Sequence, residues 1–84
     1  MATVSHKEAI TEKILGILTD KLGVEGSVLE RETSFSADLG SDSLDVLEAI
    51  MALENAFGIR IPDESIEKLT TVGSVIDYIV AHGN

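Results

Sequence analysis

One serine in this sequence is placed where a phosphate group could be attached and stabilised. Ser43 lies between an acidic, turn-forming stretch, Asp38 to Asp42, and the predicted start of an amphipathic helix. A hydroxyl at a helix N-terminus faces the positive end of the backbone dipole and several unpaired N–H groups, and both favour a phosphate ester. The position therefore predicts that Ser43 is an attachment point.

Ser43 has no sequence neighbour that could make it a hydrolytic nucleophile. Such chemistry requires an adjacent general base, and the two histidines, His6 and His82, lie near opposite ends of the chain. A calcium-binding loop also fails, because Gly40 stands where the second acid belongs, Ser43 where glycine is needed and Ala49 at the final glutamate. We thus expect no catalytic residues, no specific metal site and no enzyme activity from the chain alone.

The length and composition describe one small domain, residues 1–84. A chain of this size buries only about 60–65% of the surface that its unfolded form exposes, which argues against a deep enzyme cleft. The sequence has no cysteine, so the core must be held by helix packing without disulfides. The absence of cysteine suits a cytoplasmic protein.

The charge of the chain predicts basic protein partners. Fifteen acidic residues against six basic ones give a formal net charge of −9, which repels nucleic acid and anionic membrane surfaces. The longest uninterrupted apolar run, Ala49 to Leu53, is too short for a membrane span or the apolar core of a leader peptide. From Asp38 to Glu67 there are eight carboxylates and a single cation, Arg60. These acids flank Ser43 and are interpreted as a docking face.

Apolar periodicity predicts an all-α fold, a small bundle of three main helices plus one short helix, with a long first loop. We expect the main helices at about residues 5–21, 43–57 and 72–81, and a short helix from Pro62 through about residue 68. Asp42 or Ser43 is expected to cap the second helix, and Thr70-Thr71 the fourth. Glycines 23, 58 and 83 are the expected stops. The loop should be pinned, because several of its apolar residues are spaced so that they can turn inward: Val24, Val28, Leu29, Phe35 and Leu39. The sequence also allows a short helical turn near residues 27–30.

The helix at 43–57 divides into faces. Val46, Ile50, Leu53 and Phe57 form its expected buried stripe, whereas a second, exposed acidic face is expected to hold Asp45, Glu48, Ala49 and Ala52. Leu44, Leu47 and Met51 lie on the boundary, where an apolar side chain can serve the core or a visiting protein. The expected interior is aliphatic apart from Phe35, Phe57 and Tyr78, so any cavity within it would suit a hydrocarbon chain.

Several motifs in order and at matching spacing resemble one family. They are Asp38-Leu39-Gly40-Ser41-Asp42-Ser43-Leu44-Asp45, Met51-Ala52-Leu53-Glu54, Phe57, Ile61-Pro62-Asp63-Glu64 and Thr70-Thr71-Val72-Gly73. Together they resemble the acyl carrier proteins of dissociated fatty acid synthesis, from Ile10 to Ile79. The resemblance implies that Ser43 carries 4′-phosphopantetheine, donated by coenzyme A through a phosphopantetheinyl transferase. The thiol of that arm would hold growing acyl chains as thioesters.

The same resemblance implies where partner enzymes bind. In that family the second helix contacts fatty acid or polyketide synthase enzymes that have basic surfaces. The contacting positions correspond here to Leu44, Asp45, Leu47, Glu48 and Met51. Arg and Lys of the enzymes would pair with the two acids and speed encounter more than they tighten binding. Weak, fast binding suits a monomeric shuttle that neither binds nucleic acid nor inserts stably into membranes.

Two alternatives stay open from the sequence. Asn55 and Ala56 follow Glu54, and Arg60 stands where relatives commonly have an acid, so the chain could serve a dedicated polyketide or specialised-lipid synthase rather than the general pathway. The second alternative belongs to a different functional class: an acidic helical module that binds other proteins and carries no cofactor. Peptidyl and D-alanyl carriers resemble the chain too, but the high negative charge and Ile61-Pro62-Asp63-Glu64 favour the acyl carriers.

Overall fold

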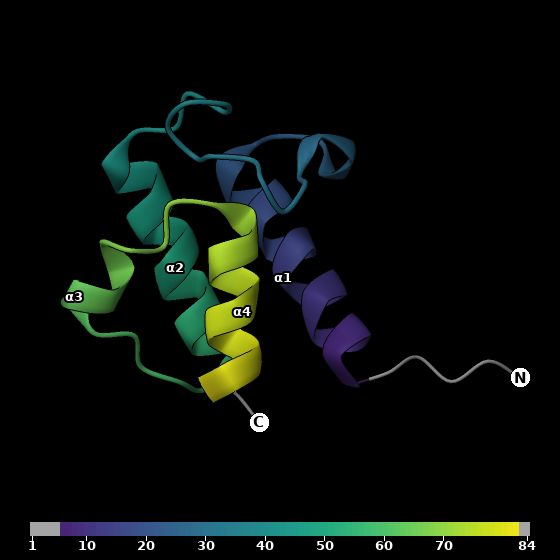
Figure 1. Ribbon diagram of the computed structural model, residues 1–84, viewed down its shortest axis with the longest axis vertical. Helices are drawn as coiled ribbons and strands as arrows, with labels where there is room; N and C mark the ends of the chain where they lie inside the picture. Colours follow the sequence, from purple (N-terminus) through teal and green to yellow (C-terminus); the bar gives the residue numbers. More distant parts are fainter. Residues whose placement is uncertain (1–5, 83–84) are drawn as a thin grey trace, which may run out of the picture.

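The computed structural model describes residues 6–82, which form a helical bundle (Figure 1). The elements are α1 (His6–Leu22), a 3₁₀ turn η1 (Gly26–Val28), α2 (Ser43–Phe57), α3 (Asp63–Ile66) and α4 (Val72–His82). Within these residues the only β pairing is one isolated bridge. The predicted all-α bundle with a long first loop is confirmed. None of the described helices is long and apolar enough to cross a membrane.

The core is aliphatic and is shared by the three main helices. Helix α1 contacts both α2 and α4, so it is the central element of the packing. The largest side chains with less than 2% of their surface exposed are Ile14, Leu18, Ile50, Leu53, Val72, Val75 and Ile79. All four residues of the expected inward stripe of α4 (Val72, Val75, Ile76 and Ile79) are buried.

Helix α2 begins and ends as its sequence predicts. Asp42 is the N-cap, and its Oδ1 accepts a hydrogen bond of 3.1 Å from the backbone N–H of Asp45. At the other end Gly58 adopts a left-handed conformation, with φ 65° and ψ 33°, and its N–H donates to the carbonyl of Glu54. Both ends are therefore fixed, which sets where Ser43 lies.

Replacing Gly58 by alanine is expected to destabilise the protein by about 1–2 kcal/mol, because a Cβ is disfavoured in the left-handed region. Space is not the cause, since no atom outside the adjacent residues lies within 4 Å of a Cβ placed at Gly58. Urea unfolding followed by circular dichroism measures the change. Gly58→Asn, which tolerates this conformation better, should lose less, and an equal loss in both variants would contradict this explanation.

The start of α4 is capped by its own residues and by the long loop. Thr71 Oγ1 accepts from the N–H of Ser74 at 3.2 Å, and Ser74 Oγ accepts from the N–H of Thr71 at 3.1 Å. The N–H of Val72 donates to the carbonyl of Thr33, and that of Gly73 to the carbonyl of Arg31, both at 3.0 Å. These N–H groups have no acceptor within their own helix, so the carbonyl groups of the loop serve as their acceptors.

The long loop is pinned by several of its apolar residues, as expected. Leu29 and Phe35 are buried, and Val24 and Leu39 are partly buried. Val28 is the exception, because it ends the 3₁₀ turn with 47% of its surface exposed. The expected helical turn near residues 27–30 is present one residue earlier, at Gly26–Val28.

Two other expectations are corrected. Ala49 is not part of the exposed acidic face but is 1% exposed, because the packing of the bundle covers this side of α2, where Leu53 lies one helical turn further on. The short helix ends at Ile66 rather than near residue 68, since Lys68 and Leu69 donate to carbonyls three residues back and form turns. The predicted helix start at residue 5 and the stop at Gly83 lie outside the described residues.

Candidate functional site

Ser43 is the first residue of α2 and its side chain is exposed. It is not the cap, because Asp42 takes that role. Within residues 6–82 no hydrogen-bond partner contacts the Ser43 hydroxyl, and none accepts from the N–H groups of Ser43 and Leu44. The helix N-terminus therefore offers an available hydroxyl beside two available backbone donors.

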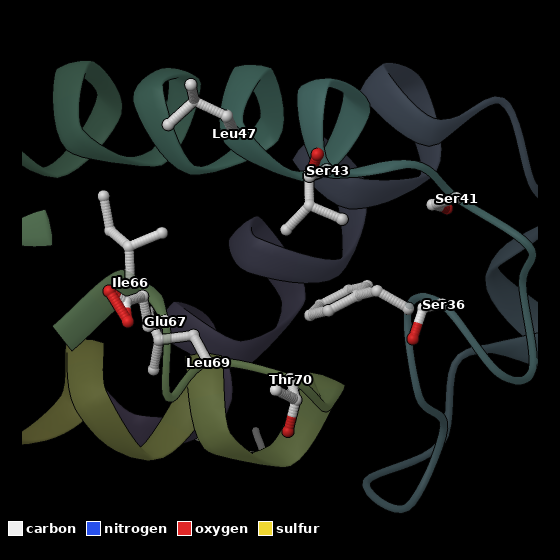
Figure 2. Close-up of a pocket in the computed structure, with 10 residues that line it drawn as sticks. Ser36, Ser41, Ser43, Leu47, Ile66, Glu67, Leu69 and Thr70 are labelled. Carbon is white, nitrogen blue, oxygen red and sulfur yellow. The ribbon is translucent and has the colours of Figure 1, made fainter. Parts of the chain in front are cut away.

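A pocket of about 300 Å³ opens beside Ser43. Its apolar lining comes from Phe35, Val46, Leu47, Ile66 and Leu69, and its polar lining from Ser36, Ser41, Ser43, Glu67 and Thr70. Figure 2 shows Ser43 and Leu47 on α2, with Ile66, Leu69 and Thr70 across the pocket. The hydroxyl thus lies next to an apolar space formed between α2, α3 and the long loop.

The loop side of this pocket is held by backbone hydrogen bonds. The N–H of Phe35 donates to the carbonyl of Thr70 at 3.1 Å, and the carbonyl of Phe35 accepts from the N–H of Ser41 at 2.9 Å. Phe35 is 3% exposed. Because both its backbone groups are bonded, the ring forms a fixed wall of the pocket.

The structure brings the five predicted partner-binding residues onto one exposed side of α2. Leu44, Leu47 and Met51 are 62%, 39% and 52% exposed, which is unusual for large apolar side chains in a small domain. Asp45 and Glu48 are exposed on the same helix. Leu47 also lines the pocket beside Ser43, so the apolar row and the pocket are continuous.

Among the residues whose side chains the structure describes, no cation forms an ion pair with the acids of this surface. Arg31, on the long loop, instead pairs with Asp77 on α4. Asp45 and Glu48 are therefore available to cations on another protein. The described part of the chain holds no group of three or more His, Cys, Asp or Glu residues that could bind a metal ion.

The sequence predicted Ser43 as the attachment residue and the exposed side of α2 as the docking surface, but it did not indicate which residues form the pocket. Thr70 was expected only to help cap the fourth helix, and Ser41 had no role beyond the motif that contains Ser43. The one signal in the sequence that could have indicated the pocket was the group of apolar residues near the short helix. An aliphatic lining of this kind suits a hydrocarbon chain. What the pattern could not show is that these residues leave a space between them.

Comparison with known proteins identifies the group to which this geometry belongs. A family model described as "Phosphopantetheine attachment site" matches residues 12–79. The acyl carrier protein of Rubrobacter xylanophilus is 53% identical over 76 residues, which cover 90% of this chain and 94% of that protein. The chain belongs to the acyl carrier protein family. The predicted resemblance is confirmed.

Further acyl carrier proteins extend the comparison. That of Clostridium acetobutylicum is 49% identical over 73 residues, covering 87% of this chain and 95% of the relative. A solved structure of an acyl carrier protein from Enterococcus faecalis superimposes with a TM-score of 0.78 at 33% identity, covering 94% of this chain and all of that one. Membership of the family assigns a carrier role in fatty acid synthesis and phosphopantetheine as the cofactor. The alternative of a module without a cofactor is thereby set aside.

Proposed function

We propose that Ser43 is the residue that carries the phosphopantetheine arm. The observation that supports this most strongly is an exposed, unbonded hydroxyl at the first position of α2, beside an apolar pocket. A phosphate esterified to it would lie next to the available N–H groups of Ser43 and Leu44, at the positive end of the helix dipole. These residues fit the phosphate end of the arm.

The arm supplies a thiol that holds acyl chains as thioesters. The protein supplies the surface that partner enzymes recognise and the pocket that covers part of the acyl chain. The pocket of about 300 Å³ is at the small end of the range for ligand sites, roughly 300–1,000 Å³. Its walls include Phe35, Ile66 and Leu69. We assign this pocket to the part of the acyl chain nearest the thioester, which it shields from water.

Loading tests the proposal directly. The protein is incubated with coenzyme A and a phosphopantetheinyl transferase, and its mass is measured before and after proteolysis. In this reaction Ser43 Oγ bonds to phosphorus, the pyrophosphate bond of coenzyme A breaks to release adenosine 3′,5′-bisphosphate, and the hydroxyl proton passes to a base. We expect one arm per chain, on the peptide that contains Ser43. An unaltered mass, or an arm on Ser36 or Ser41, would overturn the assignment.

We further propose that the exposed side of α2 is the surface that the transferase and the synthase enzymes bind. It combines an apolar row (Leu44, Leu47 and Met51) with the unpaired acids Asp45 and Glu48. Partners of this surface carry Arg and Lys around an apolar patch. The chain works as a monomeric shuttle that delivers acyl chains and does not catalyse their reactions.

Charge reversal on this surface should slow loading. For Asp45→Lys with Glu48→Lys we expect the kcat/KM of the transferase to fall by about tenfold at low salt, because the encounter between opposite charges is lost. The loss should shrink as salt rises. A matched control is Glu12→Lys with Glu25→Lys, which changes the net charge equally at exposed positions elsewhere. An equal loss in the control would show that only total charge matters.

A further inference from the structure

Gly73, in the first turn of α4, lies directly against the long loop. A Cβ at this position would lie 3.0 Å from the carbonyl oxygen of Arg31 and 3.2 Å from its Cβ and Cζ. The N–H of Gly73 donates to that same carbonyl at 3.0 Å. Since the nearest atom is backbone, it cannot rotate away as a flexible side chain can. Glycine is therefore what allows the loop to lie this close to α4.

The side chain of Arg31 continues across Gly73 to Asp77, one helical turn further along α4. Its Nη2 lies 2.7 Å from Asp77 Oδ2. Both side chains are more than half exposed, at 57% and 56%, and ion pairs so exposed contribute little to stability. The pair is thus better suited to positioning the loop than to holding the fold together.

The same stretch of loop forms the wall of the pocket beside Ser43. From Arg31 it runs along the start of α4, bonded through Thr33 to Val72, and reaches Phe35, which is bonded to Thr70. Phe35 and Thr70 both line the pocket. A displacement at Gly73 therefore has a short, hydrogen-bonded route to the pocket wall.

We propose that Gly73, Arg31 and Asp77 are positioning residues that set the wall of the pocket and so control how well a bound acyl thioester is shielded. The proposal rests on the assignment of Ser43 and of the pocket made above. None of the three residues is among those that line the pocket. They act through Phe35.

Two measurements test this on the full chain. The first is amide hydrogen exchange of the unloaded protein at positions 35, 72 and 73. The second is the rate at which hydroxylamine cleaves an octanoyl thioester on the loaded protein, in which a C–N bond forms, the C–S bond breaks and the arm regains its thiol. Octanoyl-pantetheine free in solution gives the unshielded rate.

For Gly73→Ala we expect exchange at these positions and thioester cleavage both to accelerate several-fold relative to wild type. Gly16→Ala is the matched control, because no atom outside the adjacent residues and its own helix backbone lies within 4 Å of a Cβ there, and its rates should equal those of wild type. Arg31→Asp should also accelerate cleavage. Adding Asp77→Arg to it should restore part of the shielding, because the pair can then form again with its charges exchanged.

The outcomes separate this inference from the proposed function. If every variant loads at Ser43 but all thioesters are cleaved at one rate, the positioning role is wrong while the carrier role stands. If Ser43 is not loaded at all, the proposed function itself fails. If Gly73→Ala does not fold, the test rests on Arg31→Asp and on the double variant Arg31→Asp with Asp77→Arg. Equal thioester cleavage rates in these two variants and in wild type would overturn the proposal.

Discussion

Ser43→Ala is expected to abolish loading by coenzyme A and a phosphopantetheinyl transferase. The alanine has no oxygen to bond to phosphorus, so the loss should be complete to the limit of detection and not a reduced rate. Folding should be unaffected, because Ser43 is exposed and the capping of α2 comes from Asp42. Intact-mass measurement detects the arm, and circular dichroism confirms the fold.

The pocket supplies its own controls for this experiment. Ser36 and Ser41 line the same pocket, yet neither lies at the start of a helix, and we expect Ser36→Ala and Ser41→Ala each to gain one arm. Loading of Ser43→Ala at either serine would mean that the transferase selects the pocket rather than the helix N-terminus. That result would contradict the assignment of Ser43 as the attachment residue.

Leu53→Ala is expected to lower the free energy of unfolding by about 2–5 kcal/mol. Leu53 is 0% exposed and lies in the aliphatic core. Its truncation removes buried methyl groups and leaves a cavity that the surrounding helices fill only in part. Since domains are stable by only about 5–15 kcal/mol in total, the variant should be close to unfolded at moderate temperature.

Leu44→Ala on the same helix is the matched control for Leu53→Ala. Leu44 is 62% exposed, so its truncation should change stability by less than about 0.5 kcal/mol. Thermal and urea unfolding of both variants provide the comparison. Similar losses in the two would contradict the assignment of Leu53 to the core and of Leu44 to the surface, because alanine has at least the helix propensity of leucine. Leu44→Ala should instead weaken binding of the transferase, because Leu44 belongs to the proposed partner surface.

The helices and the place of Ser43 at the start of α2 could be predicted because both depend on local signals. Apolar spacing, caps and glycine stops placed α2 correctly at residues 43–57, and its first turn placed Ser43. The error at Ala49 came from assigning one small residue to a face by its acidic neighbours. A methyl side chain is compatible with either side of a helix, so only the packing of α2 in the bundle decides its burial.

The long loop could not be predicted in the same way. Its position is fixed largely by backbone hydrogen bonds to residues 70–73, and backbone groups leave no trace in residue types. Val28 shows the result, since its apolar side chain suggested burial but the 3₁₀ turn leaves it exposed. The pocket was hidden for the same reason, because part of its wall belongs to this loop.

The bridge between Ser34 and Thr71 joins segments that are separated by α2 and α3. Contacts so distant along the chain are slow to form, because the intervening chain must first lose conformational entropy. During synthesis on the ribosome, which proceeds from the N-terminus, Ser43 is made well before the residues that secure Phe35. The proposed attachment serine is therefore synthesised before the pocket wall beside it can form, and that wall is completed only when the residues leading into α4 have been made.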